Sequence, residues 1–167
     1  MSGVFRTIQD LGAPPSEVFP FFADAFNLER ITPPFLRFRV VTPAPIEMRP
    51  GALLDYRLRI HGVPIRWRTE ITAWDPPRRF VDEQLHGPYR TWVHEHVFEP
   101  LDGGGRTRVS DTVRYAAIGG RVIERLFVDR DVERIFAYRR TMLTAEFGDA
   151  GVDRGGSMQD FGSHEHR

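Results

Sequence analysis

The sequence predicts an α+β domain in which an antiparallel sheet packs on one long C-terminal helix. Between residues 36 and 116, apolar and polar side chains alternate with a period of two, which is typical of half-buried strands, and turns rich in Gly and Pro separate the runs. From residue 120 to residue 147 the apolar period becomes helical. Because the turns are short, consecutive strands are expected to pair as antiparallel hairpins.

The elements follow in a simple order. Residues 4–11 predict a first strand, and the next stretch predicts two short helices, with Ser16 and Asp24 as candidate N-caps, that end before Pro33. Six strands follow between 36 and 116, which makes a sheet of seven. One face of this sheet is apolar and must be covered, and the helix at 120–147 is the only predicted element large enough to cover it.

Length and composition restrict the domain organisation and the function. The 167 residues suit one domain, at 1–147, while residues 148–167 are rich in Gly and charge and predict a disordered tail. Lys plus Arg and Asp plus Glu both number 23, and this zero net charge argues against nucleic-acid binding. The sequence shows neither a secretory signal nor an apolar run of the roughly 18 residues that a membrane span needs. We therefore expect a cytoplasmic protein that does not insert into membranes.

Two histidines stand two apart in the segment GPYRTWVHEHVFEP, residues 87–100. On a strand, His94 and His96 point to the same side. Trp92 and Phe98 favour this even face as the inner one, Val93 and Val97 favour the odd face, and the larger aromatic area decides for the even face.

The inner face of the preceding strand depends on the length of the turn at 87–88. A two-residue turn points one set of side chains inward, namely Val81, Glu83 and Leu85. A three-residue turn points the other set inward, namely Phe80, Asp82 and Gln84. The sequence leaves both registers open.

Asp111 interrupts an otherwise apolar strand face between Val109 and Val113. The turn DGGG at 102–105 can place it opposite His96, although a shift of one residue would move it away. A buried carboxylate needs a partner or a raised pKa. His94, His96 and Asp111 are therefore the candidate catalytic residues.

Three interpretations of this group remain open. Two imidazoles with Asp111 could share a zinc or iron ion, but cysteine is absent and no later strand carries another His, so we predict no metal and no cofactor. In an acid–base interpretation, His94 or His96 is the base and Asp111 orients it. The donor to a substrate carbonyl would then be Gln84, Tyr56 or Tyr115. In a structural interpretation, the histidines only hydrogen-bond to their neighbours and stiffen the sheet.

The element order and two stretches resemble the START-like (SRPBCC) superfamily. These stretches are APPSEVFPFFADAFNLERITPP and RFVDEQLHGPYRTWVHEHVFEP, and the second resembles a bacterial branch related to polyketide cyclases and dehydrases. The resemblance covers residues 4–147. It implies a helix-grip fold, in which a curved seven-stranded sheet and the C-terminal helix enclose an elongated apolar cavity.

The resemblance also implies a function. The expected activity is binding of a small hydrophobic or aromatic molecule, lipid- or polyketide-like, and a second copy of the chain, as a homodimer, is left open as a partner. The alternative is a cofactor-independent enzyme of the cyclase or dehydratase kind. The candidate ligand-binding residues are Tyr56, Leu58, Trp67, Thr69, Phe80, Gln84, Trp92, Tyr115 and Phe136.

Overall fold

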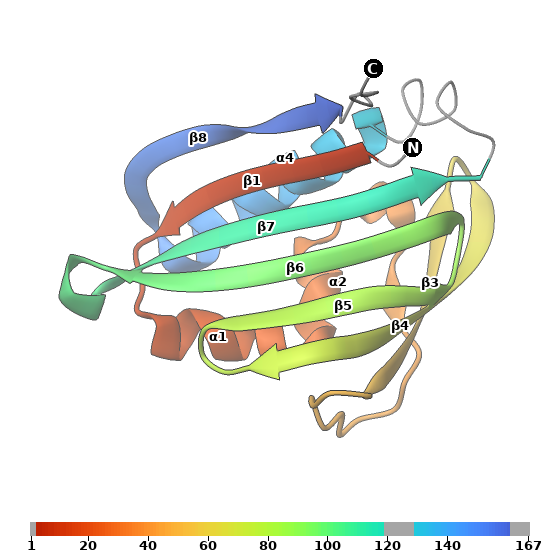
Figure 1. The fold of residues 1–167 in the computed structure, drawn as a ribbon, viewed down its shortest axis with the longest axis horizontal. Helices are drawn as coiled ribbons and strands as arrows, with labels where there is room; N and C mark the ends of the chain where they lie inside the picture. The colour runs from red at the N-terminus through yellow and green to blue at the C-terminus, as the bar shows by residue number, and fades with distance from the viewer. Residues whose placement is uncertain (1–2, 119–128, 161–167) are drawn as a thin grey trace, which may run out of the picture.

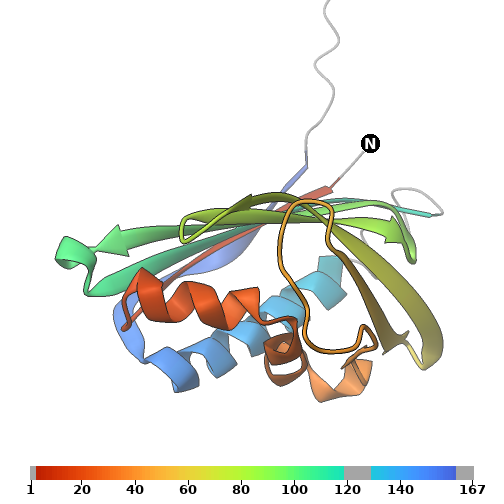
Figure 2. The same ribbon diagram turned by 90° about the horizontal axis from the view of Figure 1, so that it is seen from below.

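The computed structural model describes residues 3–118 and 129–160, and it has two layers. A curved antiparallel sheet forms one layer, and the helices lie together against its concave face (Figure 1 and Figure 2). The N-terminal half contains β1 (Gly3–Leu11), α1 (Pro15–Ala23), η1 (Ala25–Asn27), α2 (Leu28–Ile31), η2 (Pro34–Leu36), β2 (Arg39–Val40) and β3 (Leu53–Ile60). The remainder contains β4 (Val63–Asp75), β5 (Arg79–His86), β6 (Tyr89–Leu101), η3 (Asp102–Gly104), β7 (Arg106–Ala117), α4 (Asp129–Phe147) and β8 (Asp149–Asp160). The α+β class, the two short helices after β1 and the long C-terminal helix are confirmed.

Over the described residues, the sheet has eight strands in the order β2-β3-β4-β5-β6-β7-β1-β8. The seven predicted strands are β1 to β7, and each pairs with its neighbours in antiparallel register. The eighth strand differs from the disordered tail expected after residue 147, because β8 pairs with β1. Without β8, one edge of β1 would carry unpaired backbone groups, and this pairing satisfies them. Residues 161–167 lie outside the described residues.

The helical segment after β1 begins and ends at residues that suit its boundaries. Helix α1 begins at Pro15, with Pro14 as its N-cap, and no side chain caps it, so Ser16 does not have the predicted role. Proline is well suited to a first turn because its missing N–H would have had no helical partner there. Asp24 does cap the next segment, since its carboxylate accepts a hydrogen bond from the backbone N–H of Phe26 at 3.0 Å.

Helix α4 supplies the second wall of the core. Its buried residues are Val132, Phe136, Arg139 and Leu143, and three of these four are apolar as the sequence pattern predicts. The first part of the predicted helix, residues 120–128, lies outside the described residues. Among the helices that are described, none is long and apolar enough to cross a membrane.

Candidate functional site

The even face of β6 points toward the helices. His94, His96 and Phe98 are only 6%, 3% and 2% exposed, so the orientation favoured by the aromatic residues is confirmed. His96 lies opposite Asp111 of β7, the register that the DGGG turn can produce. On the opposite edge of β6, Asp82 of β5 lies opposite His94. Of the two turn lengths considered for residues 87–88, this register agrees with the three-residue turn, which points Asp82 inward. Strands β5, β6 and β7 thus bring Asp82, the two histidines and Asp111 together.

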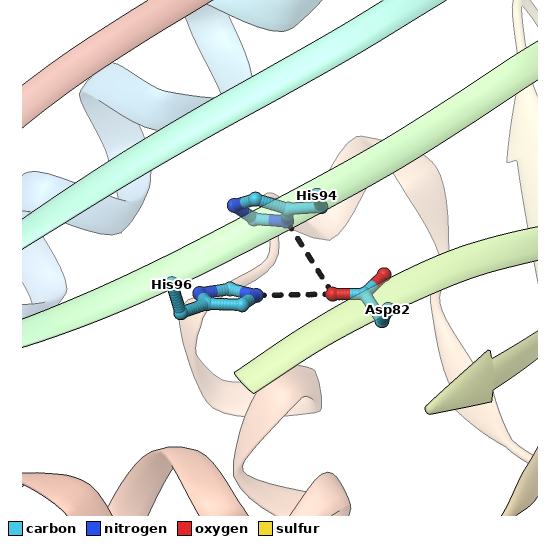
Figure 3. Close-up of side chains that lie close together, drawn as sticks. All are labelled: Asp82, His94 and His96. Carbon is cyan, nitrogen blue, oxygen red and sulfur yellow. Dashed lines mark hydrogen bonds and ion pairs between the residues drawn. The ribbon is translucent and has the colours of Figure 1, made fainter. Parts of the chain in front are cut away.

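The two carboxylates alternate with the two imidazoles in a closed network, three members of which are drawn in Figure 3. His94 Nε2 lies 2.8 Å from Asp111 Oδ1, and His96 Nδ1 lies 2.9 Å from the same oxygen, although without hydrogen-bond geometry. His96 Nε2 lies 3.0 Å from Asp82 Oδ2, and His94 Nδ1 lies 3.8 Å from that oxygen. Each carboxylate therefore contacts both histidines.

The network shifts the pKa values of the two histidines in opposite directions. Burial opposes a charge on both, but the close contact with Asp111, the hydrogen bond with Asp82 and the charges of both aspartates outweigh it at His96 and raise the pKa of that ring. Burial, and then the positive charge of His96, lower the pKa of His94 in spite of its bond to Asp111. His94 Nε2 lies 2.8 Å from Asp111 Oδ1, and because an ionised carboxylate can only accept, a neutral His94 in this contact has its proton at Nε2 and its lone pair at Nδ1.

Both carboxyl groups stay ionised. Burial raises the pKa of Asp111, but the positive charge of Arg139, the hydrogen bond with His94 and the close contact with His96 outweigh it and hold the pKa well below its ordinary value. Burial likewise opposes the charge of Asp82, whose pKa is nevertheless lowered, mainly by its hydrogen bond with His96.

Arg139 of α4 faces this network from the helix layer, and it is 7% exposed. Its guanidinium carbon lies 5.1 Å from the ring centre of Phe22 and 5.6 Å from that of Phe136. Its Nε is buried without a hydrogen-bond partner, and no carboxylate of the described residues forms an ion pair with it. Arg139 is therefore a buried cation that acts on Asp82 and Asp111 only through its charge.

A cavity of about 170 Å³ lies between the sheet, the short helices and α4. Seven of the nine candidate ligand-binding residues line it, namely Tyr56, Leu58, Trp67, Thr69, Phe80, Trp92 and Phe136. His94 and His96 line it as well, together with Asp82 and Arg139. Asp111 does not line the cavity itself, but its carboxylate contacts both histidines that do.

Two candidate residues lie outside the cavity lining. Gln84 spans the β5–β6 turn, where its Nε2 donates to the backbone oxygen of Tyr89 at 2.8 Å. Tyr115 is 1% exposed and packs beside Phe5 and Val113, and its hydroxyl donates to Asp129 at 2.7 Å. Neither residue lines the cavity, although Tyr89 and Trp92, which contact Gln84 and Tyr115 respectively, do.

Asp82 and Arg139 are the two site residues that sequence reasoning did not select. Asp82 belongs to the residues that point inward if the turn at 87–88 has three residues, and the sequence left open whether that turn has two residues or three. The signal for Arg139 was a charged residue in an apolar helical row, between Phe136 and Leu143. A lone polar residue on an otherwise apolar face, which singled out Asp111, could have singled out Arg139 too.

Asp82, His94 and His96 are the residues that could hold a metal ion, because one ligand atom from each lies within 4.8 Å of the others. His94 Nδ1, His96 Nε2 and an oxygen of Asp82 would be the ligands, with Asp111 holding the other ring nitrogens. Against this, the positive charge of Arg139 already acts on both carboxylates and opposes a metal cation beside them. The expectation of a metal-free site stays a prediction.

Comparison with solved structures shows the fold. The Zhui aromatase/cyclase from Streptomyces sp. R1128 superposes with a TM-score of 0.69 at 18% identity, covering 87% of this chain and 93% of that one. The major latex-like protein 151 from Panax ginseng gives a TM-score of 0.65 at 12% identity, over 88% and 98% of the two chains. A START superfamily protein from Mycobacterium smegmatis gives 0.61 at 10% identity, over 86% and 99%.

Comparison with models of protein families shows to which family the chain belongs. No curated protein matches the sequence. Residues 4–148 match the family model described as polyketide cyclase / dehydrase and lipid transport. This match spans most of the chain and agrees with the fold and with the resemblance in residues 4–147. The chain belongs to the polyketide cyclase / dehydrase and lipid transport family.

Proposed function

We propose that this protein binds a small hydrophobic or aromatic molecule in the cavity between the sheet and α4. The observation that carries the proposal is the cavity itself, whose lining is mostly apolar and contains the edge-to-face pair Trp67 and Trp92, with ring centres 5.4 Å apart. Family membership supports it, since the family's printed description includes lipid transport.

The volume of the cavity restricts the size of the ligand. A dry cavity of roughly 150 Å³ is known to accept benzene. The 170 Å³ found here therefore suits a single aromatic ring with a short substituent, or a short chain. A lipid or an extended polyketide would need the cavity to open, so we propose that such molecules bind only after the helices move from the sheet.

Filling the cavity should block binding. Leu58 of β3 lines the cavity, whereas Leu53 of the same strand is 48% exposed. In titrations with isopropylbenzene followed by calorimetry, Leu58→Trp is expected to weaken binding at least tenfold, or about 1.4 kcal/mol, because the new side chain occupies ligand volume. Leu53→Trp should bind as the unaltered protein does.

The same experiment can exclude the cavity as the binding site. If Leu58→Trp keeps its melting temperature and still binds isopropylbenzene with unchanged affinity, the ligand binds elsewhere. Leu58→Phe serves as a smaller replacement if the tryptophan variant does not fold. Binding that is lost equally in Leu53→Trp would also contradict the proposal.

The two histidines line the cavity and have pKa values shifted in opposite directions, which favours a second candidate function, cofactor-independent acid–base catalysis. We propose that His94 Nδ1, which carries the lone pair, accepts a proton from a carbon next to a ligand carbonyl. His96, whose pKa is raised, lines the same cavity, so its protonated form can return a proton to the substrate. Asp111 is the positioning residue, since it holds His94 Nε2–H at 2.8 Å. Such a pair suits an aldol-type cyclisation of a diketone, or a dehydration in which a β-hydroxyketone loses the proton next to its carbonyl and its hydroxyl group leaves as water.

Hydrogen exchange in D₂O tests this second function without knowledge of the substrate. Acetophenone has an exchangeable methyl group next to its carbonyl, and NMR follows its replacement of H by D. We expect the protein to accelerate this exchange, and His94→Gln to reduce the acceleration by about 10²-fold or more. His86→Gln, at an exposed site in β5, is the control. An exchange rate equal to that of buffer would leave the protein as a binder only.

A further inference from the structure

Arg139 is the one arginine among the described residues that line the cavity, and within the described part of the chain its guanidinium group forms no hydrogen bond or ion pair. Guanidinium groups stay protonated and offer five N–H donors. The Nε of Arg139 is buried without a partner, and the rings of Phe22 and Phe136 lie close to the guanidinium group. A buried donor without a partner costs free energy, and a ligand oxygen would remove that cost.

The charges around Arg139 select among oxygen-containing groups. Asp82 lines the cavity together with Arg139, and Asp111 lies directly behind the two histidines, so this buried site already contains two carboxyl groups for one guanidinium group. A ligand carboxylate would add an unbalanced negative charge to this buried site, close to the two aspartates. A carbonyl oxygen accepts the same hydrogen bonds and adds no charge.

Resting on the ligand-binding function proposed above, we propose that Arg139 is the polar anchor of the cavity and that it selects an uncharged ligand with a carbonyl oxygen. The apolar part of the ligand packs on the aromatic lining, and the oxygen accepts hydrogen bonds from the guanidinium group. Ketones, and esters or lactones of one-ring size, have this chemistry. Fatty acids and other free carboxylic acids in their ionised form do not.

Three probe ligands of nearly equal shape separate the contributions of the apolar ring, the carbonyl oxygen and the negative charge to binding. Acetophenone has the neutral carbonyl, isopropylbenzene replaces that oxygen by a methyl group, and benzoate carries the charge. Their dissociation constants are measured by calorimetry at pH 7.5 for the unaltered protein, Arg139→Gln and Arg134→Gln. Arg134 is the matched control, because it lies on the same helix, is exposed, and stacks on Phe35 outside the cavity lining.

We expect Arg139→Gln to weaken acetophenone binding about tenfold or more and to leave isopropylbenzene binding within about twofold. Arg134→Gln should change neither. In the unaltered protein, benzoate should bind at least tenfold more weakly than acetophenone. Arg139→Lys keeps the charge but not the planar fork, so it provides a folded comparison if the glutamine variant melts early, and it should restore part of the acetophenone affinity.

The outcomes distinguish the anchor from the function on which it rests. If neither acetophenone nor isopropylbenzene binds, the proposed function fails. If isopropylbenzene binds but acetophenone is equally tight in Arg139→Gln, the function stands and the anchor fails, which leaves Arg139 as a counter-charge for the two aspartates. Benzoate binding more tightly than acetophenone would overturn the preference for uncharged ligands.

Discussion

Asp111→Ala is expected to lower the free energy of unfolding by about 3–5 kcal/mol, because it leaves the buried Arg139 and the two buried histidines with one carboxylate in place of two. His94 would also lose its hydrogen bond of 2.8 Å. For a domain of this size, such a loss corresponds to a fall of roughly 6–20 °C in melting temperature. Chemical denaturation at pH 7, followed by tryptophan fluorescence, measures the effect.

The control for this variant is another aspartate that is paired but exposed. Asp55 forms a bidentate ion pair with Arg68 on the outer face of the sheet, with side-chain exposures of 41% and 50%. Asp55→Ala should shift the denaturation midpoint only slightly, since exposed ion pairs contribute little to stability. Equal effects for the two variants would show that the inner network does not contribute more than a surface pair.

His96→Gln is expected to make the stability of the protein less dependent on pH. The folded-state pKa of His96 is raised above its ordinary value, so its contribution to stability is fully present below pH 6.5. This contribution is lost as the pH rises through the folded-state pKa. The variant should therefore lose about 3 kcal/mol at about pH 6, where the charged ring lies between two carboxylates, and less at about pH 9.

The quantity to compare is the difference in unfolding free energy between the unaltered protein and the variant, measured at several pH values. His86→Gln removes an exposed histidine from the end of β5 and should change the unfolding free energy by less than about 0.5 kcal/mol throughout. A difference for His96→Gln that grows as the pH rises would have the wrong sign, and would mean that His96 is neutral in the folded protein.

The sequence predicts the strands of this protein well because each has a one-sided apolar pattern. The inner face of β6 is one example, since the areas of Trp92 and Phe98 decide between two faces with otherwise similar residues. The tail is the opposite case. Residues 149–160 have no apolar alternation, and their pairing with β1 satisfies the backbone of an edge strand, which side-chain patterns do not reveal.

The candidate site was predictable only in part. His94, His96 and Asp111 could be placed together because they interrupt or share a strand face near one turn. Whether the side chain of Asp82 points inward depends on whether the turn at 87–88 has two or three residues, and both turn lengths fit the sequence. Arg139 comes from α4, and the position of that helix against the sheet depends on packing between segments far apart in the chain.

A crystal structure of the protein with 4-bromoacetophenone tests the central claim most directly, because the anomalous signal of bromine fixes the position and direction of the ligand. We expect the ring in the cavity between the sheet and α4, with its carbonyl oxygen within hydrogen-bond distance of the Arg139 guanidinium group. Density only on the outer surface, at ligand concentrations that saturate binding in solution, would contradict the claim that this cavity is the binding site.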